Sequence, residues 1–204
     1  MVIETMEKKD GFYCEDHHGI VKTQIMLCHT GRSASYYYNG LKHRMDGKYE
    51  RIPHYMIAKD GVVVNLIEPH TTSKFFGDES IDESIIVIVL ENLGWLKRNP
   101  ETNEYNNWIG DIYKGEVFRK KWRGHLFWAT YTEEQVDSCA KLIKDLCVDM
   151  GIEMDFIGHN VHVDNVSYFE GLVSRSNYND FWTDVSPAFD FNVLIEKIEN
   201  GKEK

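Results

Sequence analysis

The segment Ile85 to Leu90 reads IIVIVL, six apolar residues in a row, of which five are β-branched. A continuous apolar run of this length is typical of a strand that is covered on both faces, as at the centre of a parallel sheet. We therefore expect this segment to be the central strand of the fold.

Four further segments predict strands around it. Gln24 to His29 (QIMLCH) is a short apolar run that ends in a histidine. His54 to Ala58 and Val62 to Ile67 are separated by a turn that contains an Asp-Gly pair, which is a strong hairpin signal. Phe156 to His159 predicts another short strand that also ends in a histidine.

Helices are predicted at two places. The longer one runs from Thr132 to Met150, where Thr132 and Gln135 fit a capping box and Gly151 stands at the expected C-cap. Asn192 to Ile198 predicts a short closing helix. Strands mixed with a long helix and a hairpin indicate an α/β fold, a single domain with a central mixed β-sheet flanked by helices.

Two long aromatic-rich stretches fit this framework poorly: Gly94 to Thr130 and Asn160 to Phe181. We interpret both as insertions on a compact core, with a small satellite core built on the tryptophans as the alternative. They account for the length of the 204-residue chain beyond one ordinary domain of roughly 150 residues. The predicted organisation is an N-terminal extension over residues 1–23 and one domain over residues 24–204.

Charge and hydropathy exclude several classes of protein. The chain has 23 Lys and Arg against 33 Asp and Glu, a net charge of -10, which argues against a nucleic-acid partner. No apolar run approaches the roughly 18 residues of a membrane span, and Met1 to Asp10 has no apolar stretch that can serve as a signal peptide. These features predict a cytoplasmic protein, in which most of the four cysteines are buried thiols.

Two histidines and one aspartate form the strongest candidate site. His29 and His159 end predicted strands, and Asp184 follows downstream. Two imidazoles and one carboxylate leave a tetrahedral Zn²⁺ ion with an open position for water. Such an ion lowers the pKa of its water towards about 7 and polarises a carbonyl, which is chemistry that hydrolyses amides. Ordinary hydrogen-bonded histidines are the alternative that the pattern alone leaves open.

The order of several motifs resembles a known family. The motifs are Cys28-His29-Thr30, Pro53 to Ile57 followed by Lys59-Asp60-Gly61, the strand Ser84 to Leu90 leading into Asn92-Leu93-Gly94, the Thr132 helix, Ile157-Gly158-His159, and Asp184 with Pro187 to Asp190. In this order they resemble zinc-dependent N-acetylmuramoyl-L-alanine amidases of the amidase-2 class, which includes phage lysozyme-type amidases and peptidoglycan recognition proteins. The resemblance covers about residues 24–198.

The resemblance implies an activity and a ligand set. His29, His159 and Asp184 would bind Zn²⁺, with Asp164 or His162 as alternatives for the third position. The substrate would be peptidoglycan, or a muropeptide, cleaved between N-acetylmuramic acid and L-alanine. The resemblance also implies a monomeric phage endolysin that acts on the cell wall after release. A recognition module without catalysis and a zinc hydrolase of another amide are the rival functions.

Other site residues follow from the same resemblance. Glu91 lies two residues beyond Val89, where the alignment places the family's glutamate, and it faces the same way along a strand as a candidate general base. A solvated carboxylate is the alternative. His54 is a candidate for substrate positioning or for polarising the scissile carbonyl, with a satisfied core histidine as the alternative. Trp182 stands where many members have a lysine, and we assign it, with Tyr36, to substrate binding.

Overall fold

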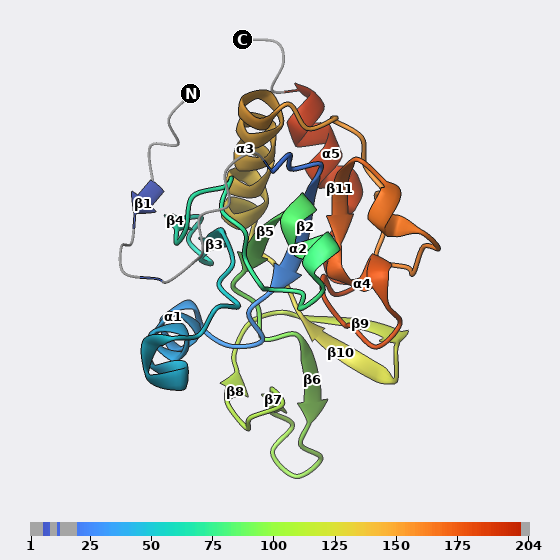
Figure 1. Cartoon of the computed structure of the whole chain (residues 1–204). Coiled ribbons are helices and arrows are strands. Elements are labelled where there is room, and N and C mark those ends of the chain that lie inside the picture. The colour runs from blue at the N-terminus through green and yellow to red at the C-terminus, as the bar shows by residue number, and fades with distance from the viewer. Residues whose placement is uncertain (1–5, 9–11, 13–19, 201–204) are drawn as a thin grey trace.

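A six-stranded mixed sheet forms the centre of the molecule in this computed structural model, which describes residues 6–8, 12 and 20–200 (Figure 1). Four of its strands are mutually parallel, β4 runs antiparallel to β3, and β1 is parallel to β4. The strands, in the spatial order β1-β4-β3-β5-β2-β11, are β1 (Met6–Lys8), β4 (Val63–Asn65), β3 (Tyr55–Ile57), β5 (Ile85–Leu90), β2 (Gln24–His29) and β11 (Gly171–Ser174).

Strand β5 occupies the position predicted from its sequence. All six of its residues are buried, and it pairs with β3 on one side and with β2 on the other. In the β2 pairing Leu27 lies opposite Ile88 and His29 opposite Leu90. The predicted hairpin is also confirmed, because β3 and β4 pair antiparallel with Met56 opposite Val64.

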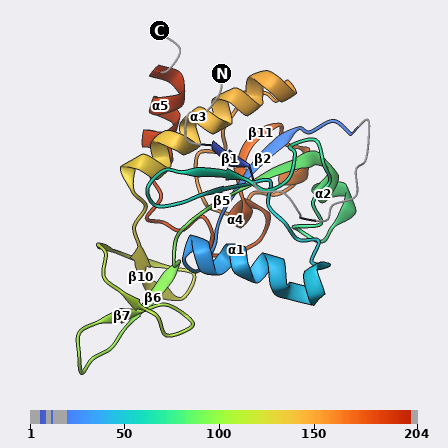
Figure 2. The same cartoon turned by 90° about the vertical axis from the view of Figure 1, so that its left-hand side faces the viewer.

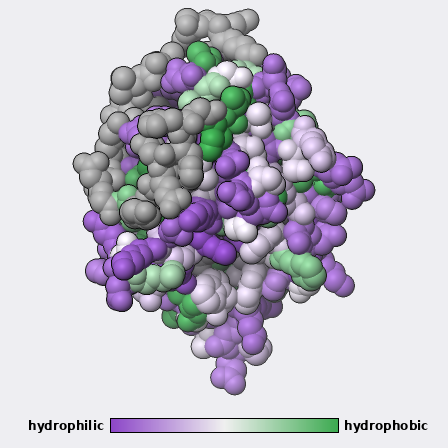
Figure 3. Space-filling view, in the orientation of Figure 1, coloured by the Kyte–Doolittle hydropathy of each residue, from purple (hydrophilic) through white to green (hydrophobic). Residues whose placement is uncertain are grey.

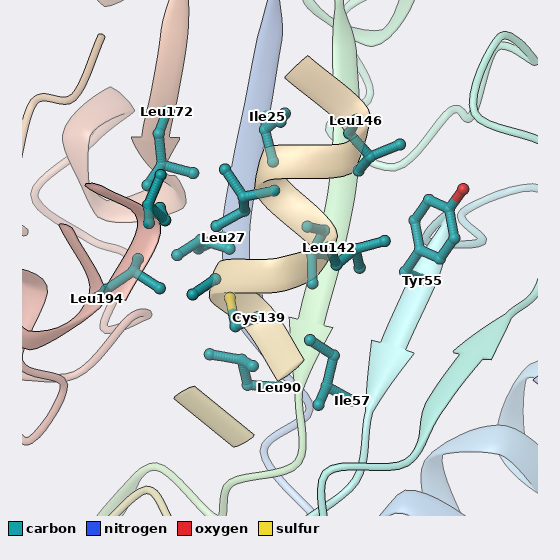
Figure 4. Close-up of a cluster of buried hydrophobic side chains, with 14 of the residues drawn as sticks. Ile25, Leu27, Tyr55, Ile57, Leu90, Cys139, Leu142, Leu146, Leu172 and Leu194 are labelled. Carbon is teal, nitrogen blue, oxygen red and sulfur yellow. The ribbon is translucent and has the colours of Figure 1, made fainter. Parts of the chain in front are cut away.

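Helices cover both faces of this sheet (Figure 2). The helices α3 (Glu133–Met150) and α5 (Phe191–Asn200) pack on one face, and α1 (Ala34–His43) lies on the other. Successive residues of a strand point to opposite faces, so Ile25 and Leu27 of β2 meet α3 (Figure 4), whereas Met26 and Cys28 share the second cluster with Leu41 of α1.

The two predicted helices are confirmed, and the ends of α3 are those that its sequence indicates. The hydroxyl of Thr132 accepts the N–H of Gln135 at 3.2 Å, and the side-chain oxygen of Gln135 accepts the N–H of Thr132 at 3.2 Å. Gly151 ends the helix at φ 66°, a left-handed conformation that glycine adopts without steric cost. Both ends of α3 are therefore set by interactions between residues close in sequence.

Residues 94–130 form a second sheet instead of a loop. Its five antiparallel strands, in the order β8-β7-β6-β10-β9, are β8 (Ile112–Tyr113), β7 (Tyr105–Asn106), β6 (Trp95–Arg98), β10 (His125–Ala129) and β9 (Val117–Trp122). Leu96, Tyr113 and Ala129 form its small buried core. Trp128 is also fully buried here and packs against Trp122, with ring centroids 5.5 Å apart, so this stretch has a small core of its own to which a tryptophan contributes.

The second stretch, residues 160–181, is part of the main sheet and not a loop upon it. It contains the 3₁₀ turn η2 (Val166–Tyr168), strand β11 and the short helix α4 (Arg175–Tyr178). The predicted strand over residues 156–159 does not form as a full strand. Of that segment only Phe156 makes a bridge, to Leu172 of β11, and His159 lies in a bend. The remaining elements are α2 (Glu79–Ser84) and η1 (Arg44–Gly47).

The described cysteines and the surface agree with the composition. Cys28, Cys139 and Cys147 are buried free thiols, as predicted, and Cys14 lies outside the described residues. Figure 3 shows polar side chains over most of the visible face, including the lowest part of the view, with apolar ones in small separate groups. None of the described helices has the length and apolar character needed to cross a membrane.

Removing volume from β5 is expected to lower stability sharply. Ile88 is fully buried between β2, β3 and α3, so an Ile88→Ala variant leaves a cavity and should lose about 2–5 kcal/mol of unfolding free energy in urea denaturation. The control is Val148→Ala, because Val148 of α3 is 72% exposed and its truncation should change stability by less than about 0.5 kcal/mol. Equal losses in the two variants would contradict the central position of β5.

Candidate functional site

His29 ends β2 at the wall of a cavity of about 300 Å³. The cavity lies where β2 meets the second sheet, and residues of both contribute to its walls. Its lining residues are His29, Gly31, Leu93, Gly94, Trp95, Trp108 and Thr183. We call it the His29 cavity.

The imidazole of His29 is held from both sides. Its Nδ1 lies 3.2 Å from the hydroxyl of Tyr131, which also accepts the N–H of Ser186 at 3.3 Å. Its Nε2 faces Gly94, where a Cβ atom would come within 2.9 Å of it. Burial lowers the pKa of His29 below its usual value, while the charge of Asp184 acts in the opposite direction. At neutral pH the ring is therefore uncharged and can accept a proton.

Asp184 lies beside His29 and is paired with a cation. Its Oδ2 accepts the N–H of His29 at 3.4 Å and lies 3.5 Å from Nη1 of Arg175, and its side chain is almost fully buried. Arg175 stacks on Trp182, with its Cζ 3.3 Å from the ring centroid. The structure thus brings together three of the predicted site residues: His29, Asp184 and Trp182. Arg175, which was not predicted as a site residue, links Asp184 to Trp182.

His159 does not join this group. It is exposed, and its Nδ1 accepts the N–H of Val161 at 3.3 Å. It lines a different cavity of about 300 Å³, with Phe118, Lys120 and Phe189, which shares no lining residue with the His29 cavity. The predicted pair of histidines is therefore separated in this arrangement.

The alternative ligands do not complete a metal site either. His162 lies 3.9 Å from Asp180 in an exposed position, and Asp164 is exposed. Nowhere in the described part of the chain do three His, Cys, Asp or Glu side chains come close enough to hold a metal ion. Cys14, His17 and His18 form a metal-like cluster in the sequence, but they lie outside the described residues. As placed, the donor set does not fit Zn²⁺.

His54 is a buried histidine whose two ring nitrogens both bond to the main chain. Its Nδ1 accepts the N–H of Val87 at 2.9 Å, and its Nε2 donates to the carbonyl of Thr71 at 3.0 Å. Burial lowers its pKa to about 3, so the ring stays neutral. It is not among the residues that line the His29 cavity. This position favours the core-histidine alternative over a catalytic role.

Glu91 and Tyr36 lie on different sides of the site. Glu91 follows β5, but its Oε2 accepts the N–H of Lys59 at 3.0 Å, so its carboxylate faces the β3–β4 turn. Tyr36 is 59% exposed on α1. The guanidinium of Arg32 lies between the rings of Tyr36 and Trp108, at 4.9 and 5.2 Å from their centroids. Neither Tyr36 nor Glu91 lines the His29 cavity, but Arg32 links Tyr36 to Trp108, which does.

Four residues of the site were not singled out from the sequence: Gly94, Trp108, Tyr131 and Arg175. Tyr131 directly precedes the cap of α3, and that position is its only sequence signal. Trp108 belongs to the second sheet and reaches the loop after β2, where its Nε1 donates to the carbonyl of Gly31 at 2.9 Å. Arg175 and Asp184 are nine positions apart in the chain, and no local sequence pattern predicts the contact between them.

Comparisons with known proteins agree with this architecture. A family model described as N-acetylmuramoyl-L-alanine amidase matches residues 19–169, more than half of the chain. Among solved structures, a selenomethionine derivative of AmpD is 11% identical with a TM-score of 0.54, over 97% of this chain and 96% of that one. No curated protein sequence gives a significant match.

Two further solved structures give matches. The N-acetylmuramyl-L-alanine amidase AmiD from E. coli, in complex with its substrate anhydro-N-acetylmuramic acid-L-Ala-D-γ-Glu-L-Lys, is 12% identical with a TM-score of 0.50. That match covers 91% of this chain but 60% of AmiD. Drosophila peptidoglycan recognition protein SD is 12% identical with a TM-score of 0.40, over 71% of this chain and 75% of that one.

The burial of His54 predicts a specific pH dependence of stability. Its folded-state pKa of about 3 lies below the ordinary value of 6.5, so protons favour the unfolded chain. The contribution of the neutral ring is complete above about pH 6.5 and is lost as the pH falls, by up to about 1.4 kcal/mol per pH unit. Urea denaturation between pH 7 and pH 4 should show a shallower decline for His54→Gln than for the unmodified chain. Parallel curves would contradict this assignment.

Gly94 is expected to be essential to the position of His29. At φ 75° an alanine is strained by about 1–2 kcal/mol, and its Cβ would lie 2.9 Å from Nε2 of His29. Gly94→Ala should therefore lower stability and shift the histidine ring signals in ¹⁵N NMR spectra. Gly110→Ala is the matched control, because Gly110 has φ 92° but no atom within 4 Å of the added Cβ. It should show the strain without the ring shift.

Proposed function

The chain belongs to the N-acetylmuramoyl-L-alanine amidase family, and from this membership we propose that it hydrolyses the amide between N-acetylmuramic acid and L-alanine. The observation that carries the proposal is the family match over residues 19–169, which includes β2, β5 and α3. The His29 cavity at the end of β2 supplies a place for the scissile bond. The substrate class that we propose is the muropeptide, of which the AmiD ligand is an example.

Amide hydrolysis requires that a water molecule lose a proton as it attacks the carbonyl. In our proposal the neutral ring of His29 takes this proton at Nε2, the nitrogen on the Gly94 side of the cavity. Nδ1–H then donates to Tyr131, which holds the ring in this orientation. The carboxylate of Asp184, adjacent to His29, favours the imidazolium that forms. Arg175 holds that carboxylate in place. The imidazolium then gives its proton to the nitrogen of L-alanine as the C–N bond breaks.

Zinc dependence, with His29, His159 and Asp184 as ligands, stays a prediction from the family resemblance. The three side chains do not gather in the structure described here, so we assign no step of the reaction to a metal. The endolysin role stays a prediction as well, in which a cytoplasmic protein reaches the cell wall after release. Lysis of bacteria on induced expression would test it.

A second candidate function is the binding of muropeptide without cleavage. Three observations favour it: Asp184 is paired with Arg175, Trp182 stands where many family members have a lysine, and His159 lies apart. In this function the His29 cavity would hold the ligand and leave its amide intact.

Digestion of purified murein sacculi tests the hydrolase. We expect release of peptides with a new amino-terminal L-alanine, identified by mass spectrometry, and no new reducing sugar ends. His29→Ala should reduce the rate by roughly 10²–10⁴-fold, the usual contribution of a general base, if the ring acts as proposed. His43→Ala is the control, because His43 is an exposed histidine at the end of α1. Its rate should be unchanged.

The same preparation separates the candidate functions and tests the zinc prediction. Binding to sacculi without release of peptide would refute the hydrolase and support the recognition module. Zinc content, measured on the unmodified chain and on His159→Ala, decides the ligand set. One zinc per chain that disappears in the variant would support the prediction, and an active chain without zinc would contradict it.

A further inference from the structure

A second, larger cavity lies next to the His29 cavity, and the second sheet alone forms it. Its volume is about 610 Å³. It shares Trp95 and Trp108 with the His29 cavity, so the two cavities adjoin at these residues. Its lining residues, all within the first part of the second sheet, are Trp95, Lys97, Arg98, Asn99, Pro100, Asn106, Asn107, Trp108 and Gly110. We call it the β6 cavity.

The charge of the β6 cavity is opposite to that of the whole chain. The chain has a net charge of -10, yet the residues that line this cavity include a lysine and an arginine and no carboxylate. Arg98 donates to the side-chain oxygen of Asn103 at 2.7 Å. The main chain of Lys97 pairs with β7, but its ammonium group has no hydrogen-bond or ion-pair partner among the residues that the structure describes. Its ammonium group is therefore available to an anionic ligand.

The two tryptophans have defined positions beside this ammonium group. Trp95 and Lys97 are two residues apart in β6, so their side chains point to the same face of the sheet. Trp95 stacks on His125, with ring centroids 4.4 Å apart and an interplanar angle of 11°. Trp108, although 51% exposed, is fixed by its bond to the carbonyl of Gly31. Fixed aromatic surfaces next to an unpaired cation suit an aliphatic chain that carries a carboxylate.

We propose that the β6 cavity binds the peptide beyond the scissile amide, and that Lys97 pairs with a free carboxylate of that peptide. This inference rests on the proposed function, because it takes the scissile bond to lie in the His29 cavity. In a peptide of the sequence L-Ala-D-γ-Glu, the γ linkage leaves the α-carboxylate of the glutamate free. That group lies about 7 Å from the scissile amide, at roughly 3.5 Å per extended residue. Neighbouring cavities that share two tryptophans are compatible with this span.

The glycan is a poorer ligand for this cavity. Its aliphatic ring faces can stack on tryptophan, but the carboxyl group of N-acetylmuramic acid is already consumed in the amide to L-alanine. A glycan there would leave Lys97 without an anionic partner. The peptide can pack its aliphatic part on the tryptophans and pair its carboxylate with Lys97.

A binding experiment that changes one charge on each side tests the pairing. The ligands are the tripeptide L-Ala-D-γ-Glu-L-Lys and the same peptide with its glutamate α-carboxylate converted to the amide, with binding followed by tryptophan fluorescence. The unmodified chain should bind the acid about 3- to 10-fold more tightly than the amide, as for a charge-assisted hydrogen bond. Lys97→Ala and Lys97→Gln should both lose this preference. Lys121→Ala, an exposed lysine of β9 that does not line the cavity, should retain it.

The outcomes separate this inference from the proposed hydrolysis. Equal affinity for acid and amide in the unmodified chain, or a preference that survives in both Lys97 variants, would overturn the pairing. Tighter binding of a peptide-free disaccharide that does not depend on Lys97 would assign the cavity to glycan and overturn it as well. Because binding needs no cleavage, a Lys97-dependent preference in a chain that releases no peptide with an amino-terminal L-alanine from sacculi upholds the cavity and refutes the hydrolase. Hydrolysis by a chain that shows no preference for the acid over the amide supports the hydrolase and overturns the role of Lys97 in the β6 cavity.

Discussion

The parallel pairing of β2 with β5 is the interaction on which the rest of the structure depends. Both strands are almost completely buried, so their main-chain hydrogen bonds form away from water and their side chains supply both cores. The pairing sets His29 opposite Leu90. Two residues later Asn92, fully buried, donates to the carbonyls of Ala129 and Thr130 and accepts the N–H of Gly94. The side-chain amide of Asn92 thereby joins the segment after β5 to the start of β6 and to the end of β10, two neighbouring strands of the second sheet.

Electrostatics distinguish the two cavities that meet at Trp95 and Trp108. The His29 cavity contains a neutral imidazole, whose uncharged state follows from burial, and beside it a carboxylate already matched by Arg175. The β6 cavity carries unmatched positive charge in an acidic protein. A substrate with an uncharged scissile amide and an anionic group further along its peptide fits these two cavities. The amide would lie in the His29 cavity, and the anionic group would meet the positive charge of the β6 cavity.

Much of the fold could be predicted from the sequence, because its signals are local. The apolar run of β5, the Asp-Gly turn between β3 and β4 and the capping box of Thr132 with Gln135 act within a few residues, and the structure confirms all three. Of the strand predicted over residues 156–159 only a bridge from Phe156 to β11 forms, and β11, for which no strand was predicted, pairs with β2. The second sheet was missed as a sheet because its short strands carry mixed aromatic and polar residues with little alternation.

The composition of the core, the ends of α3 and the order of motifs that places the chain in its family can all be read from the residues along the chain. Which polar residues meet depends on how the chain folds. His29 and Asp184 are 155 residues apart and lie together, whereas His159, much nearer to Asp184 in sequence, lines a different cavity from His29. The reason is physical: helix caps and strand periodicity arise from contacts between near neighbours, while a site depends on the register of strands and on the course of the chain between them.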